Sequence, residues 1–350
     1  MSENPPSGLL SGPEPDPARD AGHTDAPPRV GFFTDTSVCI GCKACEVACK
    51  EWNAVPEDGL SLSGMSYDNT QGLGASTWRH VAFIEQRVPA GPPEAEHRRQ
   101  LPLTATESGR AEEGGSGCGC GSGGGGGCGG GGGGGAAAGG PASVAETVQQ
   151  GGQAGELRWL MSSDVCKHCT HAACLDVCPT GSLFRTEFGT VVVQQDICNG
   201  CGYCVPACPY GVIEQRPDDG RAFKCTMCYD RLTAGQEPAC AKACPTQSIQ
   251  FGPLDELRER AALRVDQLRQ AGVEGAQLYG EDPDDGVGGD GAFFLLLDRP
   301  EVYGLPPDPV VTTRDLPAMW KHAGRAAGAL VGGLALAFVL PEFARRKGHR

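Results

Sequence analysis

The spacing of the cysteines restricts the fold of this chain more than any other feature. Sixteen of its 19 cysteines fall into four groups of four, and every group begins with C-x2-C and ends with C-x3-C. Only the gap in the middle of a group varies, from two residues to four or eleven. The groups are Cys39, Cys42, Cys45 and Cys49; Cys166, Cys169, Cys174 and Cys178; Cys198, Cys201, Cys204 and Cys208; and Cys225, Cys228, Cys240 and Cys244.

This spacing is typical of iron–sulfur ligation. Three thiolates on one tight loop can hold three irons of a [4Fe–4S] cluster, and the fourth cysteine ligates the other cluster of a pair. A disulfide framework would have an even number of cysteines. Zinc also binds thiolates, but zinc sites are built from separated C-x2-C pairs or from cysteines with His partners. We therefore favour four [4Fe–4S] clusters over a zinc-stabilised interaction scaffold.

The exchange of the fourth cysteine predicts how the groups pair. Groups two and three are close in the sequence and would form one two-cluster module, which leaves groups one and four to form another around it. The predicted ligand sets are set 1, Cys39, Cys42, Cys45 and Cys244; set 2, Cys225, Cys228, Cys240 and Cys49; set 3, Cys166, Cys169, Cys174 and Cys208; and set 4, Cys198, Cys201, Cys204 and Cys178. We expect an α+β fold of two ferredoxin-like modules, one inserted in the other, followed by a transmembrane helix.

Composition divides the rest of the chain. Residues 1–30 are rich in Pro, Gly and Asp and lack the apolar run of a signal peptide, so they are predicted to be a disordered leader. The outer module is expected at 31–88 and 221–252, a flexible Gly-rich insert at 89–156, the inner module at 157–220, a helix–strand extension at 253–320, a transmembrane anchor at 321–345 and a basic tail at 346–350.

The insert holds the three remaining cysteines, Cys118, Cys120 and Cys128, within residues 114–140, of which 19 are glycine. Glycine-rich chain loses much conformational entropy when it is fixed, so we do not expect these cysteines to be ligands. His168 and His171 lie inside the second group, but that group already has four cysteines, and we do not expect them to bind metal either.

Several elements are predicted outside the cysteine groups. Strands are expected within 76–88, at 190–193 and at 292–297. A helix is expected from Pro253 to about Ala271, because Pro begins it, acidic residues fill its first turn and Gly272 follows it. Its apolar stripe is Leu257, Ala261, Val265 and Leu268, which we expect to cover a core.

The C-terminal segment contains 16 residues without charge, at 326–341. At 1.5 Å per residue they span about 24 Å in a helix, and aromatic and basic residues flank them, as in membrane anchors. We expect a single-pass helix in the cell membrane, although a soluble core helix is the alternative. The basic end, with Arg345, Arg346, Lys347 and Arg350, would stay in the cytoplasm and the cluster domain would face outward.

The chain shows no sign of binding a nucleotide or a nucleic acid. Its formal net charge of −14 argues against a nucleic-acid partner, which would require a basic surface. It has no dinucleotide-binding glycine loop after a strand and no Walker loop. We expect no catalytic residues and interpret the chain as an electron-transfer protein.

Several stretches resemble one protein family. They are Cys39 to Cys49, SYDNTQGLGASTW at 66–78, the two central cysteine groups, KCTMCYDRLTAGQEPACAKACPTQSIQFG at 224–252, GVGG at 286–289, YGLPPDP at 303–309 and Trp320-Lys321. Together they resemble the iron–sulfur (beta) subunit of membrane-bound respiratory formate dehydrogenase, and more broadly the four-cluster ferredoxin-type subunits of molybdopterin oxidoreductases.

The resemblance implies a role and partners. Such a subunit receives electrons from a catalytic (alpha) subunit that oxidises formate at a molybdenum or tungsten pterin. It passes them to a cytochrome b (gamma) subunit in the membrane and so to quinone. An equivalent subunit of a hydrogenase or of another molybdopterin oxidoreductase is the alternative, because the cysteines alone do not separate these complexes.

Overall fold

The computed structural model describes residues 16–59, 64, 67–68, 70–88 and 156–347. The chain divides into a compact unit of Met1–Gln86 with Arg158–Arg350 and a second unit, Arg87–Leu157. All sixteen grouped cysteines lie in the described part of the first unit. The three cysteines of the predicted insert lie outside the described residues.

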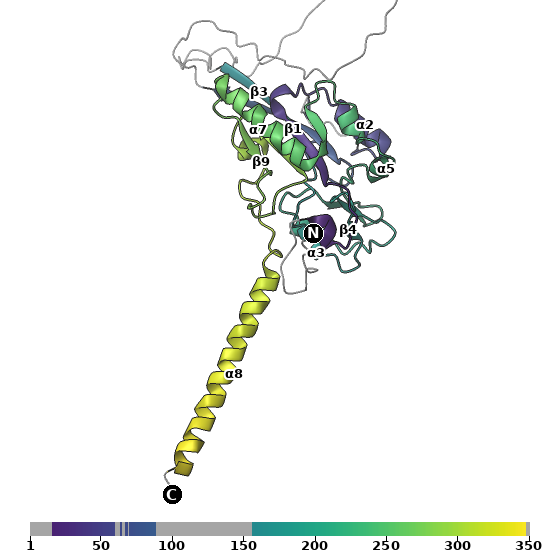
Figure 1. Ribbon diagram of the computed structural model, residues 1–350. Coiled ribbons are helices and arrows are strands. Elements are labelled where there is room, and N and C mark those ends of the chain that lie inside the picture. The colour runs from purple at the N-terminus through teal and green to yellow at the C-terminus, as the bar shows by residue number, and fades with distance from the viewer. Residues whose placement is uncertain (1–15, 60–63, 65–66, 69, 89–155, 348–350) are drawn as a thin grey trace, which may run out of the picture. The chain divides into compact units, whose positions relative to one another are not determined.

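A four-stranded sheet joins segments that are far apart in the sequence (Figure 1). Its strands follow the order β8-β1-β10-β9, with β8 at Ile249–Pro253, β1 at Val30–Asp35, β10 at Ala292–Leu296 and β9 at Gln277–Tyr279. β1 pairs antiparallel with β8 and parallel with β10, and β9 pairs antiparallel with β10. The predicted strand at 292–297 is confirmed.

The predicted helix–strand extension at 253–320 contributes to this sheet. It supplies β9 and β10, two of the four strands of this sheet. β1 is almost wholly buried, so the backbone groups on both of its edges need hydrogen-bonding partners. β8 supplies the partners on one edge, and β10, about 260 residues along the chain, supplies them on the other.

One face of the sheet is covered by α7 (Leu254–Gln270). Its buried residues include Leu257, Ala261, Val265 and Leu268, so the predicted helix and its apolar stripe are confirmed. Side chains alternate between the faces of a strand: Phe33 and Phe293 stack on the α7 side with ring centroids 5.3 Å apart. Neighbouring Phe32 packs on the opposite face, among the cysteine-bearing segments.

The opposite face carries short elements. The helical ones are η1 (Thr36–Val38), α2 (Ala44–Trp52), α3 (Ala173–Asp176), α4 (Cys204–Ala207), α5 (Tyr229–Thr233), α6 (Ala239–Lys242) and η3 (Pro300–Tyr303). The strands form three two-stranded pairs: β2 (Arg79–Val88) with β3 (Glu156–Val165), β4 (Leu183–Arg185) with β5 (Val191–Val193), and β6 (Glu214–Gln215) with β7 (Ala222–Phe223). β2 and β5 confirm the strands predicted at 76–88 and 190–193.

The predicted disordered leader does not extend over residues 16–30, which are ordered. α1 (Pro17–Asp20) begins after Asp16, whose side chain accepts hydrogen bonds from the backbone N–H groups of Ala18 and Arg19. Ala18 is 2% exposed, and His23 Nε2 lies 3.1 Å from the carbonyl oxygen of Arg185. An N-terminal cap and a buried apolar side chain therefore fix a segment whose composition alone indicates disorder.

The C-terminal segment forms a single helix, α8 (Leu316–Lys347). Within the described ranges, no helix is both long and apolar enough to cross a membrane. The predicted transmembrane anchor at 321–345 is therefore wrong, as is the single-pass membrane location deduced from it. The physical reason is composition: five of the 16 uncharged residues are alanine and three are glycine, which carry little apolar surface.

Candidate iron–sulfur sites

The four C-x2-C loops share one backbone feature. The residue before the second cysteine has a positive φ in every loop: 65° at Gly41, 47° at His168, 71° at Gly200 and 56° at Met227. Glycine adopts this left-handed conformation freely, whereas other residues adopt it rarely. Its recurrence at the same position indicates that the loop geometry requires it, even where the residue is not glycine.

A short helix carries the third cysteine of each group. Cys45 lies in α2, Cys174 in α3, Cys204 in α4 and Cys240 in α6. The fourth cysteine follows four residues later in every group. Four residues correspond to about one turn of a helix. Cys49 lies in the same helix as Cys45, whereas the other three fourth cysteines come just after their helices end.

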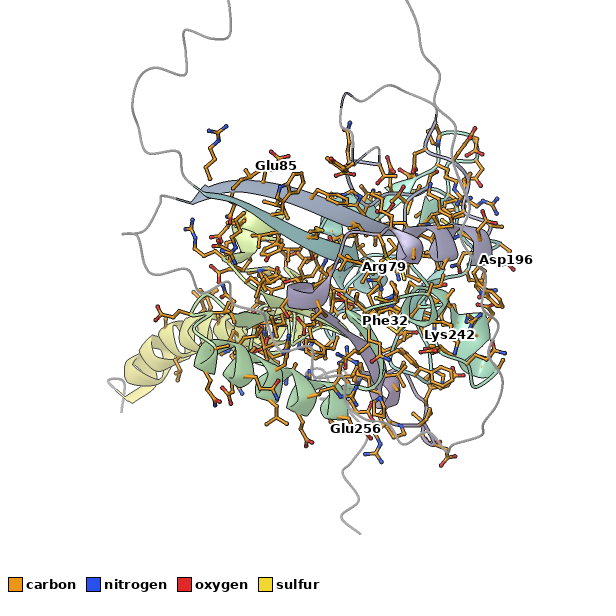
Figure 2. All side chains as sticks on the ribbon, turned by 90° about the horizontal axis from the view of Figure 1, so that it is seen from above. Phe32, Arg79, Glu85, Asp196, Lys242 and Glu256 are labelled. Atoms are coloured by element: carbon orange, nitrogen blue, oxygen red, sulfur yellow. The ribbon has the colours of Figure 1, made fainter. Side chains whose placement is uncertain are left out.

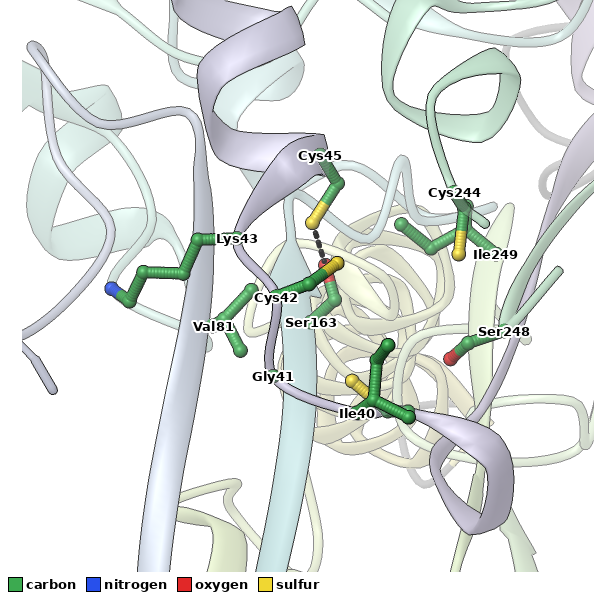
Figure 3. A pocket seen from close by; sticks show the side chains of 11 residues that line it. Ile40, Gly41, Cys42, Lys43, Cys45, Val81, Ser163, Cys244, Ser248 and Ile249 are labelled. Atoms are coloured by element: carbon green, nitrogen blue, oxygen red, sulfur yellow. Dashed lines mark hydrogen bonds between the residues drawn. The ribbon is translucent and has the colours of Figure 1, made fainter. Parts of the chain in front are cut away.

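The cysteines of set 1 line one cavity (Figure 3). Cys39, Cys42 and Cys45 come from the first group and Cys244 from the last, and they surround this cavity together with Ile249. The structure therefore brings together residues that are about 200 positions apart in the chain.

One hydroxyl lies against a thiol of set 1. The Cys45 Sγ atom is 3.2 Å from the hydroxyl oxygen of Ser163, which β3 contributes to the cavity wall (Figure 3). Burial raises the pKa of Cys45 to about 11, although Arg79 and this hydroxyl act in the opposite direction.

Set 2 forms where α2 and α6 pack together. Burial raises the pKa of Cys49 far above its ordinary value, and the neighbouring thiols Cys225, Cys240 and Cys228 add to that effect. The side-chain amide of Asn53 donates hydrogen bonds to two thiols of the set, at 3.8 Å to Cys49 Sγ and 3.7 Å to Cys228 Sγ. Cys49 thus lies among the cysteines of the fourth group.

Set 3 lines a second cavity. Its cysteines are Cys166, Cys169, Cys174 and Cys208, and the wall also includes Lys224. Burial raises the pKa of Cys174 to about 12, and Lys224 opposes this rise.

The two histidines of the second group occupy different environments. His168 is 1% exposed, and its Nδ1 atom accepts a hydrogen bond from the backbone N–H of Val191 at 3.1 Å. His171 is only partly buried. Burial lowers the pKa of both imidazoles.

Set 4 is partly exposed to solvent. Burial raises the pKa of Cys204 to about 11, and the adjacent thiols Cys198, Cys201 and Cys178 contribute to that rise. Cys201 is exposed. The set combines three cysteines of the third group with the last cysteine of the second.

The donor chemistry of these sites fits [4Fe–4S] clusters. All sixteen cysteines are free thiols, with no disulfide among them. Burying four thiolates together is unfavourable unless a cationic centre neutralises them, and a [4Fe–4S] cluster takes four thiolates. Over the part of the chain that the structure describes, no group of three or more His, Cys, Asp or Glu residues is arranged to hold a single metal ion.

The four sets follow one another in space. Cysteines of different sets interact electrostatically in pairs, and these interactions link the sets in the order 1-2-3-4. The pairs are Cys45 with Cys240, Cys225 with Cys166, and Cys174 with Cys204. Sets 1 and 4 lie at the two ends, and each includes an exposed cysteine, Cys42 in the first and Cys201 in the last.

Two buried cations beside the sets were not predicted from the sequence. Arg79 and Lys224 are each 1% exposed, and Figure 2 shows Arg79 in the interior near Phe32 while Lys242 lies at the periphery. Burial lowers the pKa of Arg79. The surrounding cysteines, Cys240 most of all, together have a larger effect in the opposite direction, so the pKa of Arg79 lies above its ordinary value. In the sequence, nothing distinguishes these two residues from other basic ones.

Two further polar contacts could have been found from the sequence. The hydroxyl of Thr180 lies 3.6 Å from Cys178 Sγ, and that of Thr246 lies 3.8 Å from Cys244 Sγ. Both threonines stand in the tripeptide Cys-Pro-Thr, which occurs at the ends of the second and fourth groups. The repetition of this tripeptide was the available signal.

Comparison with known proteins places these sites in a family. Residues 157–254 match one family model described as a 4Fe-4S dicluster domain, and residues 38–182 match another with the same description. Two such domains imply four [4Fe–4S] clusters.

Individual relatives agree with this assignment. The formate dehydrogenase iron–sulfur subunit of Haemophilus influenzae is 35% identical over 317 residues, which cover 89% of this chain and 79% of the relative. The iron–sulfur subunit of the nitrate-inducible formate dehydrogenase of Escherichia coli is 34% identical over 84% of this chain and 78% of its own length. The B subunit of the anaerobic dimethyl sulfoxide reductase of Escherichia coli is 46% identical, but over only 27% of this chain and 46% of its own. The protein belongs to the family of formate dehydrogenase iron–sulfur subunits.

Proposed function

We propose that this chain is the electron-transfer subunit of a formate dehydrogenase complex and that it carries electrons through four [4Fe–4S] clusters. The observation that carries this proposal is the convergence of cysteines from four distant segments into four successive sets. Like its relatives, the chain is a non-catalytic iron–sulfur subunit. Each bound cluster would supply one-electron redox chemistry.

We propose sets 1 to 4 as the cluster ligands. The nested arrangement follows from this assignment, because sets 1 and 2 mix the first and fourth groups, whereas sets 3 and 4 mix the second and third. The cavity lining of set 1, with Cys244 beside Cys39, supports it. So does the position of Cys208 beside Cys166 in the lining of set 3.

The protein around the sets would exclude water and hold them in order. Cys45, Cys166, Cys204, Cys225 and Cys240 are all part of one buried apolar cluster. Such surroundings keep solvent from the inner sets and so influence their reduction potentials. The exposed cysteines at the two ends, in sets 1 and 4, leave those sets accessible to redox partners.

Two partners would complete the path. We propose that a catalytic subunit, which oxidises formate at a molybdenum or tungsten pterin, delivers electrons to one end, and that a cytochrome b subunit takes them from the other toward quinone. The formate dehydrogenase relatives support the formate-oxidising partner. The proposal of a cytochrome b partner comes from the family resemblance.

A subunit of another molybdopterin oxidoreductase is the second candidate. The match to the dimethyl sulfoxide reductase subunit, which covers 95 residues, supports this second candidate. The formate dehydrogenase relatives match over 299 and 317 residues, and they therefore favour formate.

The experiment is anaerobic purification of the tagged chain with whatever subunits accompany it. We expect a brown protein with about sixteen irons per chain, the number that four [4Fe–4S] clusters require. We also expect a co-purifying pterin-binding subunit and reduction of a viologen dye by formate. A colourless, zinc-containing protein would contradict the proposal, and hydrogen-dependent activity without formate activity would favour the hydrogenase alternative.

A further inference from the structure

Arg79 occupies the space between sets 1 and 2. Its Nη2 atom donates to Cys240 Sγ of set 2 at 3.3 Å. Its Nη1 atom donates to Ser163, at 3.2 Å to the carbonyl oxygen and 3.3 Å to the hydroxyl. That same hydroxyl contacts Cys45 of set 1. One guanidinium therefore contacts set 2 directly and set 1 through a single hydroxyl.

Lys224 occupies the corresponding position between sets 2 and 3. It precedes Cys225 of set 2 in the chain and lines the cavity of set 3. Its ammonium group donates to the carbonyl oxygens of Val191 and Cys225, the latter at 2.9 Å. Set 2 thus has Arg79 bonded to one of its thiols and Lys224 bonded to the backbone of another of its cysteines.

These cations have no carboxylate partner among the described residues. The partners of Arg79 are a carbonyl, a hydroxyl, a thiol and the ring of Phe32, whose centroid is 4.8 Å away. The partners of Lys224 are two carbonyls. By contrast, the third fully buried cation near the sets, Lys167, pairs with Asp164. A buried charge requires a compensating charge, and the thiolate sets are the anionic groups beside Arg79 and Lys224.

We propose that Arg79 and Lys224 raise the reduction potential of the cluster held by set 2. This inference rests on the proposed function, because it requires a cluster at that set. Reduction adds negative charge to a cluster, so a fixed cation stabilises the reduced form more than the oxidised form. A hydrogen bond to a ligand sulfur acts in the same direction. Arg79 supplies both effects and Lys224 supplies the charge.

The test is a redox titration of the full chain with its clusters in place, followed by electron paramagnetic resonance. The signal of set 2 is identified as the one altered by Cys225→Ser, because Cys225 lies in the C-x2-C loop of that set. We expect Arg79→Gln to lower the reduction equilibrium constant of that signal by about tenfold or more, equivalent to 59 mV for one electron. Arg79→Lys keeps the charge and should cause a smaller fall.

Lys242→Gln is the matched control. Lys242 follows Cys240 by two residues, but its side chain is 71% exposed and pairs with Glu237. Solvent screens an exposed charge, so the potential of set 2 should not change in this variant. An equal fall in Lys242→Gln and Arg79→Gln would overturn the proposal, as would an unchanged potential in Arg79→Gln.

Lys224→Gln provides an independent measurement if Arg79→Gln loses its clusters. We expect the potential of set 2 to fall in this variant too, and no fall would refute the proposal. A wild-type chain that assembles no clusters would instead contradict the proposed function. The two failures are therefore distinguishable by the iron content of the wild-type protein.

Discussion

Cys49 shows how a single residue links two parts of the chain. It belongs by sequence to the first cysteine group and lies on α2, four residues after Cys45. In the fold the thiols that raise its pKa are those of Cys225, Cys240 and Cys228, all from the fourth group. A single helical turn thus separates a side chain of set 1 from one of set 2.

Replacement of Cys49 by serine should therefore damage the cluster of set 2 and spare that of set 1. Serine offers a harder ligand than a thiolate, and soft thiolates are what iron–sulfur clusters prefer. Electron paramagnetic resonance of the reduced protein would show the loss of one signal of four. Cys118→Ser, in the insert, is the control and should leave iron content unchanged. Loss of the set 1 signal in Cys49→Ser would refute the assignment.

At the scale of elements, the left-handed residue in each C-x2-C loop is the recurring constraint. At Gly41 it combines with a close approach: an added Cβ would lie 2.6 Å from the sulfur of Met161 and 2.6 Å from a ring carbon of Phe83. Gly211 also has a positive φ, of 64°, but a Cβ there would meet nothing within 4 Å. A comparison of substitutions at these two glycines therefore separates the cost of backbone strain from the cost of steric crowding.

Gly41→Ala should destabilise the protein more than Gly211→Ala. Both substitutions place alanine in a left-handed conformation, which costs about 1–2 kcal/mol, but only the first also creates a steric clash. Thermal unfolding of the cluster-loaded chain should give a midpoint at least about 2 °C lower for Gly41→Ala than for Gly211→Ala. Equal midpoints would show that the loop near Met161 relaxes.

The helix α7 allows a similar comparison between its two faces. Leu257 is 1% exposed, whereas Leu263 on the same helix is 65% exposed. Leu257→Ala should cost about 2–5 kcal/mol because it leaves a cavity against the sheet. Leu263→Ala should change stability by less than about 0.5 kcal/mol. Denaturant unfolding followed by circular dichroism measures both, and similar losses in the two variants would argue against the observed packing.

At the scale of the whole molecule, the described part of the chain has two different kinds of interior. One apolar cluster contains five cysteines of the proposed sets, among them Cys166 and Cys225. Another, between α7 and the sheet, contains none and is built from residues such as Phe33, Leu257 and Phe293. The packing of the first cluster should therefore depend on the groups that its cysteines bind, whereas the packing of the second should not.

Removal of iron by a chelator should therefore loosen one region and spare the other. Metal binding at thiol sites is coupled to folding, so backbone amides of α4 and α6 should exchange hydrogen much faster without clusters. Amides of α7 and β10 should keep most of their protection. Hydrogen exchange with mass spectrometry compares the loaded and iron-free proteins, and uniform loss of protection would contradict this division.

The chemistry of this protein can be predicted from sequence alone, because ligand spacing within a loop or one helical turn is a local property. The C-x2-C loops and the four-residue step from Cys45 to Cys49 can be recognised without knowledge of the fold. The amphipathic helix α7 was predictable for the same reason, since its apolar period of 3.6 is local. The uncharged run at 326–341 led to a wrong prediction, because absence of charge is not the same as apolar surface.

The surroundings of the sets, by contrast, depend on tertiary contacts. β10 joins β1 across most of the chain, and no local pattern in a strand specifies its partner at that distance. Arg79 and Lys224 look like surface residues in the sequence, because lysine and arginine are rarely buried without a partner. Their burial follows from anionic thiolate sets that exist only after four distant segments have come together.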